Sequence, residues 1–227
     1  MAYTAIYDAC VLYPAPLRDF LMWLALTDLF KARWTEEIHA EWMRNVLKNR
    51  PDLTFEQLTR TKNLMNANVR DCLVTDYEPL IAAIKLPDPK DCHVLAAAIR
   101  AQATIIVTFN LRDFPNQILK PYNVKAVHPD EFVQSLIELN PIAVCMAAQS
   151  QRQTLKNPPK TTDEYLETLL KSGLKQTVTL MRCPWQRLKP YRFVRNEIYC
   201  GIISSSWSCK LGNNFGSISR SSPSINS

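Results

Sequence analysis

The chain begins with the apolar run Tyr3-Thr4-Ala5-Ile6-Tyr7, and a carboxylate, Asp8, follows it directly. A second apolar run extends from Thr104 to Phe109, and its β-branched residues are typical of an interior parallel strand. The acidic residue Asp113 closes the turn that follows this second run. Because parallel sheets bind ligands outside the carboxyl ends of their strands, we expect Asp8 and Asp113 at one edge of a sheet.

The order of the remaining segments predicts an open α/β sheet flanked by helices. Strands are expected over 3–8, 73–74, 104–109 and 124–127, and helices over 17–30, 35–48, 54–69, 79–84 and 92–101. From Pro129 onward only helices are expected, over 130–139, 141–155 and 162–171, with Gly173 as the C-terminal cap of the last. We therefore expect a sheet domain at residues 1–135 and an all-helical appendage at 136–182.

Residues 183–227 differ in composition from the rest of the chain. They hold three of the four glycines, ten serines and a single acidic residue. We interpret them as an irregular tail, either a disordered extension or a stretch translated out of frame or across an insertion. The tail carries 6 basic residues against 1 acidic, whereas residues 1–182 carry 21 against 20. The net charge of +6 is therefore weak evidence for nucleic-acid binding.

The spacing of the cysteines and the length of the apolar runs indicate the cellular compartment of the protein. The seven cysteines are irregularly spaced without a CxxC pair, which favours reduced thiols in a cytoplasmic protein over a disulfide framework or zinc site. The longest apolar runs, 20–26 and 142–148, are far shorter than the roughly 18 residues that a membrane span requires. No basic segment precedes an apolar one at the N-terminus, so no secretory signal is expected.

Further acidic residues occupy positions that would join Asp8 and Asp113. Glu37 and Glu41 lie one turn apart on a predicted helix, and Pro87-Asp88-Pro89-Lys90-Asp91 resembles the start of another. Carboxylates gathered at one edge repel one another unless divalent cations hold them. The hard oxygen ligands suit Mg²⁺ or Mn²⁺, which indicates a metal-dependent reaction on a phosphodiester.

Each of these positions also has a structural interpretation. Asp88 and Asp91 could be helix caps with no further role, and Asn110 and Asp113 could close a turn with no further role. The glutamates could be solvated surface charges. We interpret the three histidines, His39, His93 and His128, as structural. Cys10 and Cys92 lack the His–Asn arrangement of a thiol nucleophile.

Four motifs in this order resemble the PIN-domain nucleases, most of all the VapC-type ribonuclease toxins of bacterial toxin–antitoxin pairs. The motifs lie at Tyr7–Pro14, Trp34–Glu41, Leu86–Ala98 and Val107–Phe114. The resemblance covers residues 3–135, and the helical part through Arg182 is similar to the C-terminal extension of one branch of such toxins. Residues 183–227 resemble nothing in the family.

The resemblance implies a Mg²⁺- or Mn²⁺-dependent endoribonuclease that cuts structured RNA such as tRNA or rRNA. It also implies a cognate antitoxin that blocks the site, and either a homodimer or a toxin–antitoxin hetero-oligomer. By position, the catalytic residues are Asp8, Glu41, Asp91 and Asp113, of which the three aspartates bind the metal. Glu37, Asp88, Thr108 and Asn110 are alternative or supporting residues, and Glu41 fits the family's helical glutamate better than Glu37.

Two other classes of function compete with this one. A phosphatase of the haloacid-dehalogenase type needs a second aspartate two residues after Asp8, where this chain has Cys10. A catalytically impaired PIN fold would bind RNA or an antitoxin without cleavage. The complete set of four acids argues against it, and the unusual tail argues for it.

Overall fold

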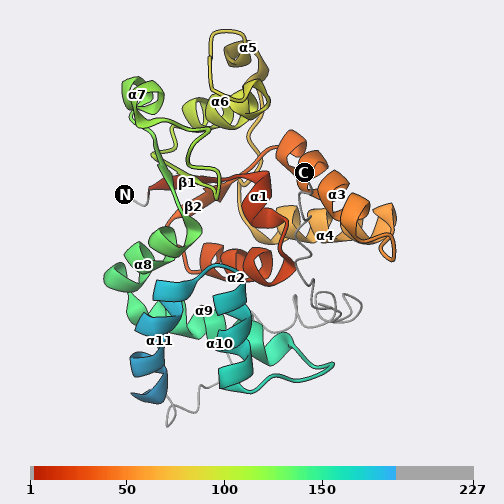
Figure 1. Ribbon diagram of the computed structural model, residues 1–227, viewed down its shortest axis with the longest axis vertical. Coiled ribbons are helices and arrows are strands. Elements are labelled where there is room, and N and C mark those ends of the chain that lie inside the picture. Colours follow the sequence, from red (N-terminus) through yellow and green to blue (C-terminus); the bar gives the residue numbers. More distant parts are fainter. Residues whose placement is uncertain (1–2, 188–227) are drawn as a thin grey trace, which may run out of the picture.

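The computed structural model describes residues 3–187, and side chains through Arg182. Its centre is a sheet of four parallel strands in the order β2-β1-β3-β4. These strands are β1 (Thr4–Tyr7), β2 (Lys31–Arg33), β3 (Ile105–Val107) and β4 (Lys125–Val127). Helices flank the sheet, so the predicted α/β class is confirmed (Figure 1).

The two central strands, β1 and β3, place the polar residues that follow them at the same edge. Asp8 donates its backbone N–H to the carbonyl of Val107 at 3.1 Å, and Thr108 donates to Val127 at 3.0 Å. The ladder thus continues one residue beyond the strands. Ile6 and Val107 are fully buried, as expected for a parallel strand covered on both faces.

Nine helical segments connect or cover the strands within residues 9–122 of the described chain. In Figure 1, α5, α6 and α7 lie on one side of the sheet and α2 lies on the other. The segments are α1 (Ala9–Leu12), α2 (Ala15–Ala25), α3 (Glu36–Asn49), α4 (Phe55–Asn68), α5 (Glu78–Ile81), η1 (Pro89–Asp91), α6 (Cys92–Arg100), α7 (Asn116–Leu119) and η2 (Lys120–Tyr122).

Local capping residues begin the two long helices α3 and α4. The Thr35 side chain accepts from the backbone of Ile38, and Thr54 forms a reciprocal capping box with Gln57. Both caps were predicted from the sequence, because a Thr N-cap satisfies backbone donors that the helix itself leaves free.

The helical appendage consists of α8 (Pro129–Leu139), α9 (Pro141–Thr154), α10 (Thr162–Lys171) and α11 (Lys175–Arg187). The buried Asp130 carboxylate accepts from the backbones of Gln176 and Thr177, both at 2.9 Å, and so fastens α11 to α8. Gln151 donates to the carbonyl of Pro16 at 3.1 Å and joins α9 to α2. These helices gather on the α2 side of the sheet (Figure 1).

The turn between α10 and α11 contacts the loop that follows β3. Gly173 lies there at φ +92°, a conformation that favours glycine. The C-cap of α10 is Ser172, and Gly173, predicted as the cap, directly follows it and donates its backbone N–H to Leu170 at 3.1 Å. A Cβ at this position would meet Cε1 of Phe109 at 3.2 Å. The Phe109 ring also packs edge-on against His128, with ring centroids 5.2 Å apart. The appendage therefore supports the residue that directly follows Thr108.

Several expected elements differ from those observed. The helix expected over 17–30 ends at Ala25, and β2 follows where no strand was predicted. Leu73 forms only an isolated bridge with Trp34. The helix α11 was not predicted as a separate element, and it continues to Arg187, inside the segment expected to be irregular. The rest of the expected tail, residues 188–227, lies outside the described residues.

No helix within residues 3–187 combines the length and apolar character needed to cross a membrane.

Candidate active site

Asp8 is the buried centre of the polar edge, with 3% of its surface exposed. Its Oδ2 accepts from the Thr108 hydroxyl at 2.6 Å and from the Cys10 thiol at 3.0 Å. Burial raises the pKa of Asp8, and so does the charge of Glu41, whereas the two hydrogen bonds lower the pKa. The carboxylate is thus held in a fixed orientation by donors on its own loop and on the neighbouring strand end.

Cys10 acts here as a hydrogen-bond donor and not as a nucleophile. Its sulfur donates to Asp8 and accepts from the backbone N–H of Phe109 at 3.2 Å. Burial, followed by the charge of Asp8, raises the pKa of the thiol well above its usual range. The thiol therefore stays protonated, in agreement with the expectation that it is no nucleophile.

Asp91 shows that the predicted acids converge in space. It lies at the N-terminus of α6 and is half-buried. Burial, together with the charges of Asp8, Asp113, Asp88 and Glu41, raises the pKa of Asp91 to about 7. Within the described residues, no ion pair joins any of these four aspartates to a cation.

The predicted helix cap and turn are also present, in addition to the convergence of the acidic residues. Asp88 accepts from the backbone of Lys90 at 2.9 Å and caps η1. Asp113 donates its backbone N–H to the carbonyl of Asn110 at 3.0 Å, and Asn110 donates to the Thr108 hydroxyl at 3.0 Å. The Asp88 side chain thus shapes its loop, as do the backbones of Asn110 and Asp113, while Asp88 and Asp113 also contribute charge near Asp91.

The two glutamates of α3 have different surroundings. Glu41 raises the pKa of both Asp8 and Asp91, whereas the Glu37 carboxylate accepts from the Tyr77 hydroxyl at 3.2 Å. His93 lies between them, with Nε2 3.6 Å from Glu41 and Nδ1 3.7 Å from Glu37. The sequence predicts only a structural role for His93, because its partners lie too far away in sequence for any local pattern to reveal them.

The other two histidines are structural, as expected. His39 is fully buried, shares a 2.9 Å hydrogen bond with Asn66 and accepts from the Trp42 indole at 2.9 Å. Burial lowers the pKa of His39 to about 4. His128 accepts from the backbone of Asp130 and caps α8.

The charges of the acidic residues influence one another, but their side chains do not form a complete metal-binding site. Among the described side chains, no three His, Cys, Asp or Glu residues are grouped closely enough to hold a metal ion. The chemistry of the set nevertheless suits one, because a half-buried carboxylate among four others has no cation to offset their repulsion.

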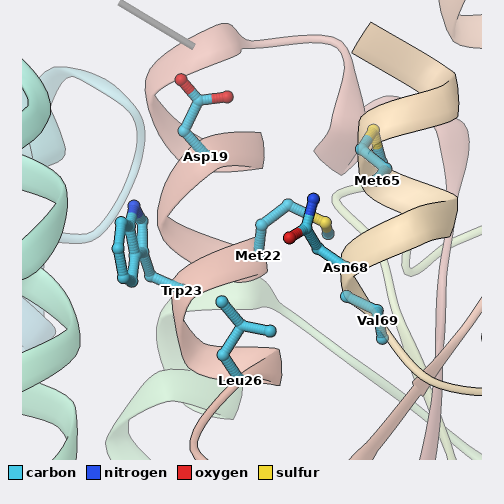
Figure 2. A pocket seen from close by; sticks show the side chains of 7 residues that line it. All are labelled: Asp19, Met22, Trp23, Leu26, Met65, Asn68 and Val69. Atoms are coloured by element: carbon cyan, nitrogen blue, oxygen red, sulfur yellow. The ribbon is translucent and has the colours of Figure 1, made fainter. Parts of the chain in front are cut away.

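Two hollows in the structure lie away from these acids. One of about 20 Å³, between α2 and α4, is shown in Figure 2 and is lined mainly by apolar residues: Asp19, Met22, Trp23, Leu26, Met65, Asn68 and Val69. It has room for about one water molecule. The other is an open groove along α4 beside Phe55 and Leu64. None of the predicted site residues lines either hollow, so neither is the substrate site proposed here.

Comparison with known proteins agrees with this arrangement. Residues 4–112 match the PIN domain family, and residues 129–183 match the VapC50 C-terminal domain family. The chain thus carries a PIN domain, and a region that matches the C-terminal domain of VapC50 follows it. These matches confirm the predicted resemblance to VapC-type toxins with a C-terminal extension.

A relative in Mycobacterium tuberculosis, named "Putative ribonuclease VapC50", is 42% identical to this PIN-domain protein over 93 residues. The aligned part covers 41% of this chain and 54% of the relative, so the chain spans about half the length of that protein. No solved structure matches the chain.

Proposed function

We propose that this PIN-domain protein is a Mg²⁺- or Mn²⁺-dependent endoribonuclease and the toxin of a toxin–antitoxin pair. The observation that carries the proposal is the convergence of Asp8, Asp88, Asp113 and Glu41 on Asp91, with no cationic side chain of the described residues paired to the aspartates. The PIN family match and the name of the mycobacterial relative support cleavage of RNA.

The proposed site assigns a role to each residue. Asp8, Asp91 and Asp113 would hold the ion, with Glu41 beside Asp8 and Asp91. Thr108 and Cys10 orient Asp8 through their hydrogen bonds to Oδ2. A divalent cation bound there would neutralise charge that develops on the phosphodiester and activate a water molecule. Glu37 and Asp88 remain supporting residues, as does Asn110, whose backbone orders the loop after Thr108.

The substrate and partners are proposed on the family resemblance. They are a structured RNA such as tRNA or rRNA, an antitoxin that covers the site, and a homodimer or toxin–antitoxin hetero-oligomer. The cytoplasm suits the four cysteines whose side chains are described, Cys10, Cys72, Cys92 and Cys145, all of which are free thiols. We propose residues 1–135 as the nuclease domain and 136–182 as its extension, with a boundary that lies inside α8, the first helix of the appendage.

The test is cleavage of total tRNA and rRNA by the purified full chain, with Mg²⁺, Mn²⁺ or EDTA, beside Asp8→Asn. The variant keeps the shape of the side chain and removes its charge, so we expect cleavage to fall by about 10²-fold or more, in line with loss of electrostatic stabilisation at a site. Mn²⁺ binding in the absence of RNA should weaken in parallel.

The control is Glu36→Gln. It neutralises a carboxylate of α3 that forms an ion pair with Lys62 and is not part of the proposed site. This variant should cleave like the wild type. Folded wild-type protein that binds RNA without cutting it under any of these conditions would favour the binding alternative. Cleavage that persists in EDTA or in Asp8→Asn would contradict the metal-dependent site.

A further inference from the structure

The imidazole of His93 bridges two carboxylates of α3. Its Nε2 lies 3.6 Å from Oε2 of Glu41, and its Nδ1 lies 3.7 Å from Oε2 of Glu37. The residue is 5% exposed, although its neighbours at these contacts are partly open to solvent. Nδ1 is buried and has no hydrogen-bond partner, which is a costly state unless a nearby charge offsets it.

The bridge follows from the geometry of the two helices. Glu37 and Glu41 are one turn apart and lie on the same face of α3, and His93 is the second residue of α6. The two ring nitrogens lie on opposite edges of the imidazole, so one metal ion could not take both carboxylates and the ring together. The arrangement is therefore a brace between side chains and not a second metal site.

Glu41 needs such a brace because of its position. It lies close enough to Asp8 and Asp91 to raise the pKa of each, so its own charge is repelled by theirs. Among the described residues, the His93 ring, with Nε2 3.6 Å away, is the only group that can become cationic within 4 Å of the Glu41 carboxylate. Glu37 is fixed from the other side by the Tyr77 hydroxyl, which makes it an anchor for the far edge of the ring.

We propose that His93 is a positioning residue that holds the Glu41 carboxylate against the aspartates, with Glu37 as its anchor. This inference rests on the proposed function, because it assigns Glu41 to the site. His93 itself touches neither the ion nor the RNA. Its contribution is to order a long, half-exposed side chain that is otherwise free to rotate away from Asp8 and Asp91.

Three substitutions separate the two ring contacts. His93→Gln keeps an N–H donor close to the position of Nε2, His93→Asn keeps one close to Nδ1, and His93→Ala removes both. In the full chain, we expect His93→Ala to weaken Mn²⁺ binding by about 10-fold or more, the usual range for residues that orient a metal ligand. His93→Gln should restore most of the affinity and of kcat, and His93→Asn should not.

The His93 substitutions are also combined with Glu41→Gln, and the urea-unfolding midpoint of each single and double variant is measured in EDTA. The matched control uses Glu36→Gln in place of Glu41→Gln. If the contact exists, the shifts in midpoint for His93→Ala and Glu41→Gln are not additive, whereas those for His93→Ala and Glu36→Gln are additive. This arm needs neither metal nor RNA.

The outcomes distinguish the two proposals. Wild-type protein that neither binds Mn²⁺ nor cleaves RNA contradicts the proposed function, and the EDTA cycle then still decides whether His93 restrains Glu41. Additive shifts, unchanged Mn²⁺ binding in a folded His93→Ala protein, or recovery by His93→Asn instead of His93→Gln would each overturn the role of His93.

Discussion

At the scale of single residues, the candidate site holds carboxylates whose charged form is disfavoured by burial and by their neighbours. Burial raises the pKa of both Asp8 and Asp91, and neighbouring carboxylates raise that of Asp91 as well. The sequence predicted these positions, because a strand end and a helix start have local signatures. It did not reveal that Cys10 and Thr108 both donate to Asp8, or that His93 braces Glu41, since those partners meet only in the tertiary structure.

Asp91 makes the metal-free protein sensitive to pH. Its folded pKa, about 7, lies above the unfolded value of 3.8, so its neutral form favours folding below about pH 4 and this advantage is lost as the pH rises through 7. In EDTA at pH 8, Asp91→Asn should therefore be more stable than the wild type by about 1 to 2 kcal/mol after solvent screening.

The measurement is urea unfolding of both proteins in EDTA at several pH values. The difference between them should shrink steadily from pH 8 toward pH 4. Asp163→Asn is the control, because Asp163 is an exposed residue of α10 far from these acids in sequence. A difference that is constant with pH would show that Asp91 is not under this repulsion.

At the scale of elements, the sequence predicted the start of a helix where the capping residue belongs to that helix. It failed where the stabilising residue lies far away in the chain. Thr35 and Thr54 each bond within their own helix, and both helix starts were predicted. The strand β2 has only Ala32 buried between two basic residues, so it lacks the apolar run of a central strand. The start of α11 is capped by Asp130, 46 residues earlier in the chain, which no local pattern can show.

The α11 cap gives a stability prediction. Asp130→Ala leaves the backbone N–H groups of Gln176 and Thr177 without their acceptors, and Thr177 is fully buried. We expect a loss of about 1 to 2 kcal/mol in the free energy of unfolding, as for other N-cap deletions. Asp130→Asn keeps one carbonyl oxygen and should lose less.

Thermal unfolding and circular dichroism would measure this effect. Equal losses for the Ala and Asn variants would indicate that the charge near the helix N-terminus, and not the hydrogen bonds, is what stabilises α11. Unchanged stability in both would contradict the cap.

At the scale of the whole molecule, the appendage and the sheet domain share a contact at the site. Gly173, in the turn after α10, lies against Phe109, which follows the strand-end residue Thr108. The sequence predicted the glycine as a helix cap but not its second role, because Gly173 and Phe109 meet only in the tertiary structure.

Gly173→Ala should therefore disturb both stability and the site. The positive φ disfavours any side chain, and the added Cβ would lie 3.2 Å from the Phe109 ring. We expect a loss of about 1 to 2 kcal/mol and a lower affinity for Mn²⁺, since the Phe109 backbone also bonds Cys10.

Phe109→Leu is the matched background for this test. In that background the steric part of the Gly173→Ala effect should shrink while the backbone part remains, and unfolding with Mn²⁺ titration separates the two. Equal effects in both backgrounds would show that the ring contact contributes nothing. Wild-type Mn²⁺ affinity in Gly173→Ala would show that the appendage does not reach the site.

The contact of Gly173 with Phe109 has a consequence for how the protein is made. A growing chain leaves the ribosome from its N-terminus, so Asp8 emerges first, Asp113 about a hundred residues later, and the Gly173 turn later still. The aspartates cannot be gathered before Asp113 has been synthesised, and Gly173 cannot support the loop after β3 before the appendage follows. If the protein is the ribonuclease proposed above, a nascent chain that ends before these residues would therefore lack a complete site.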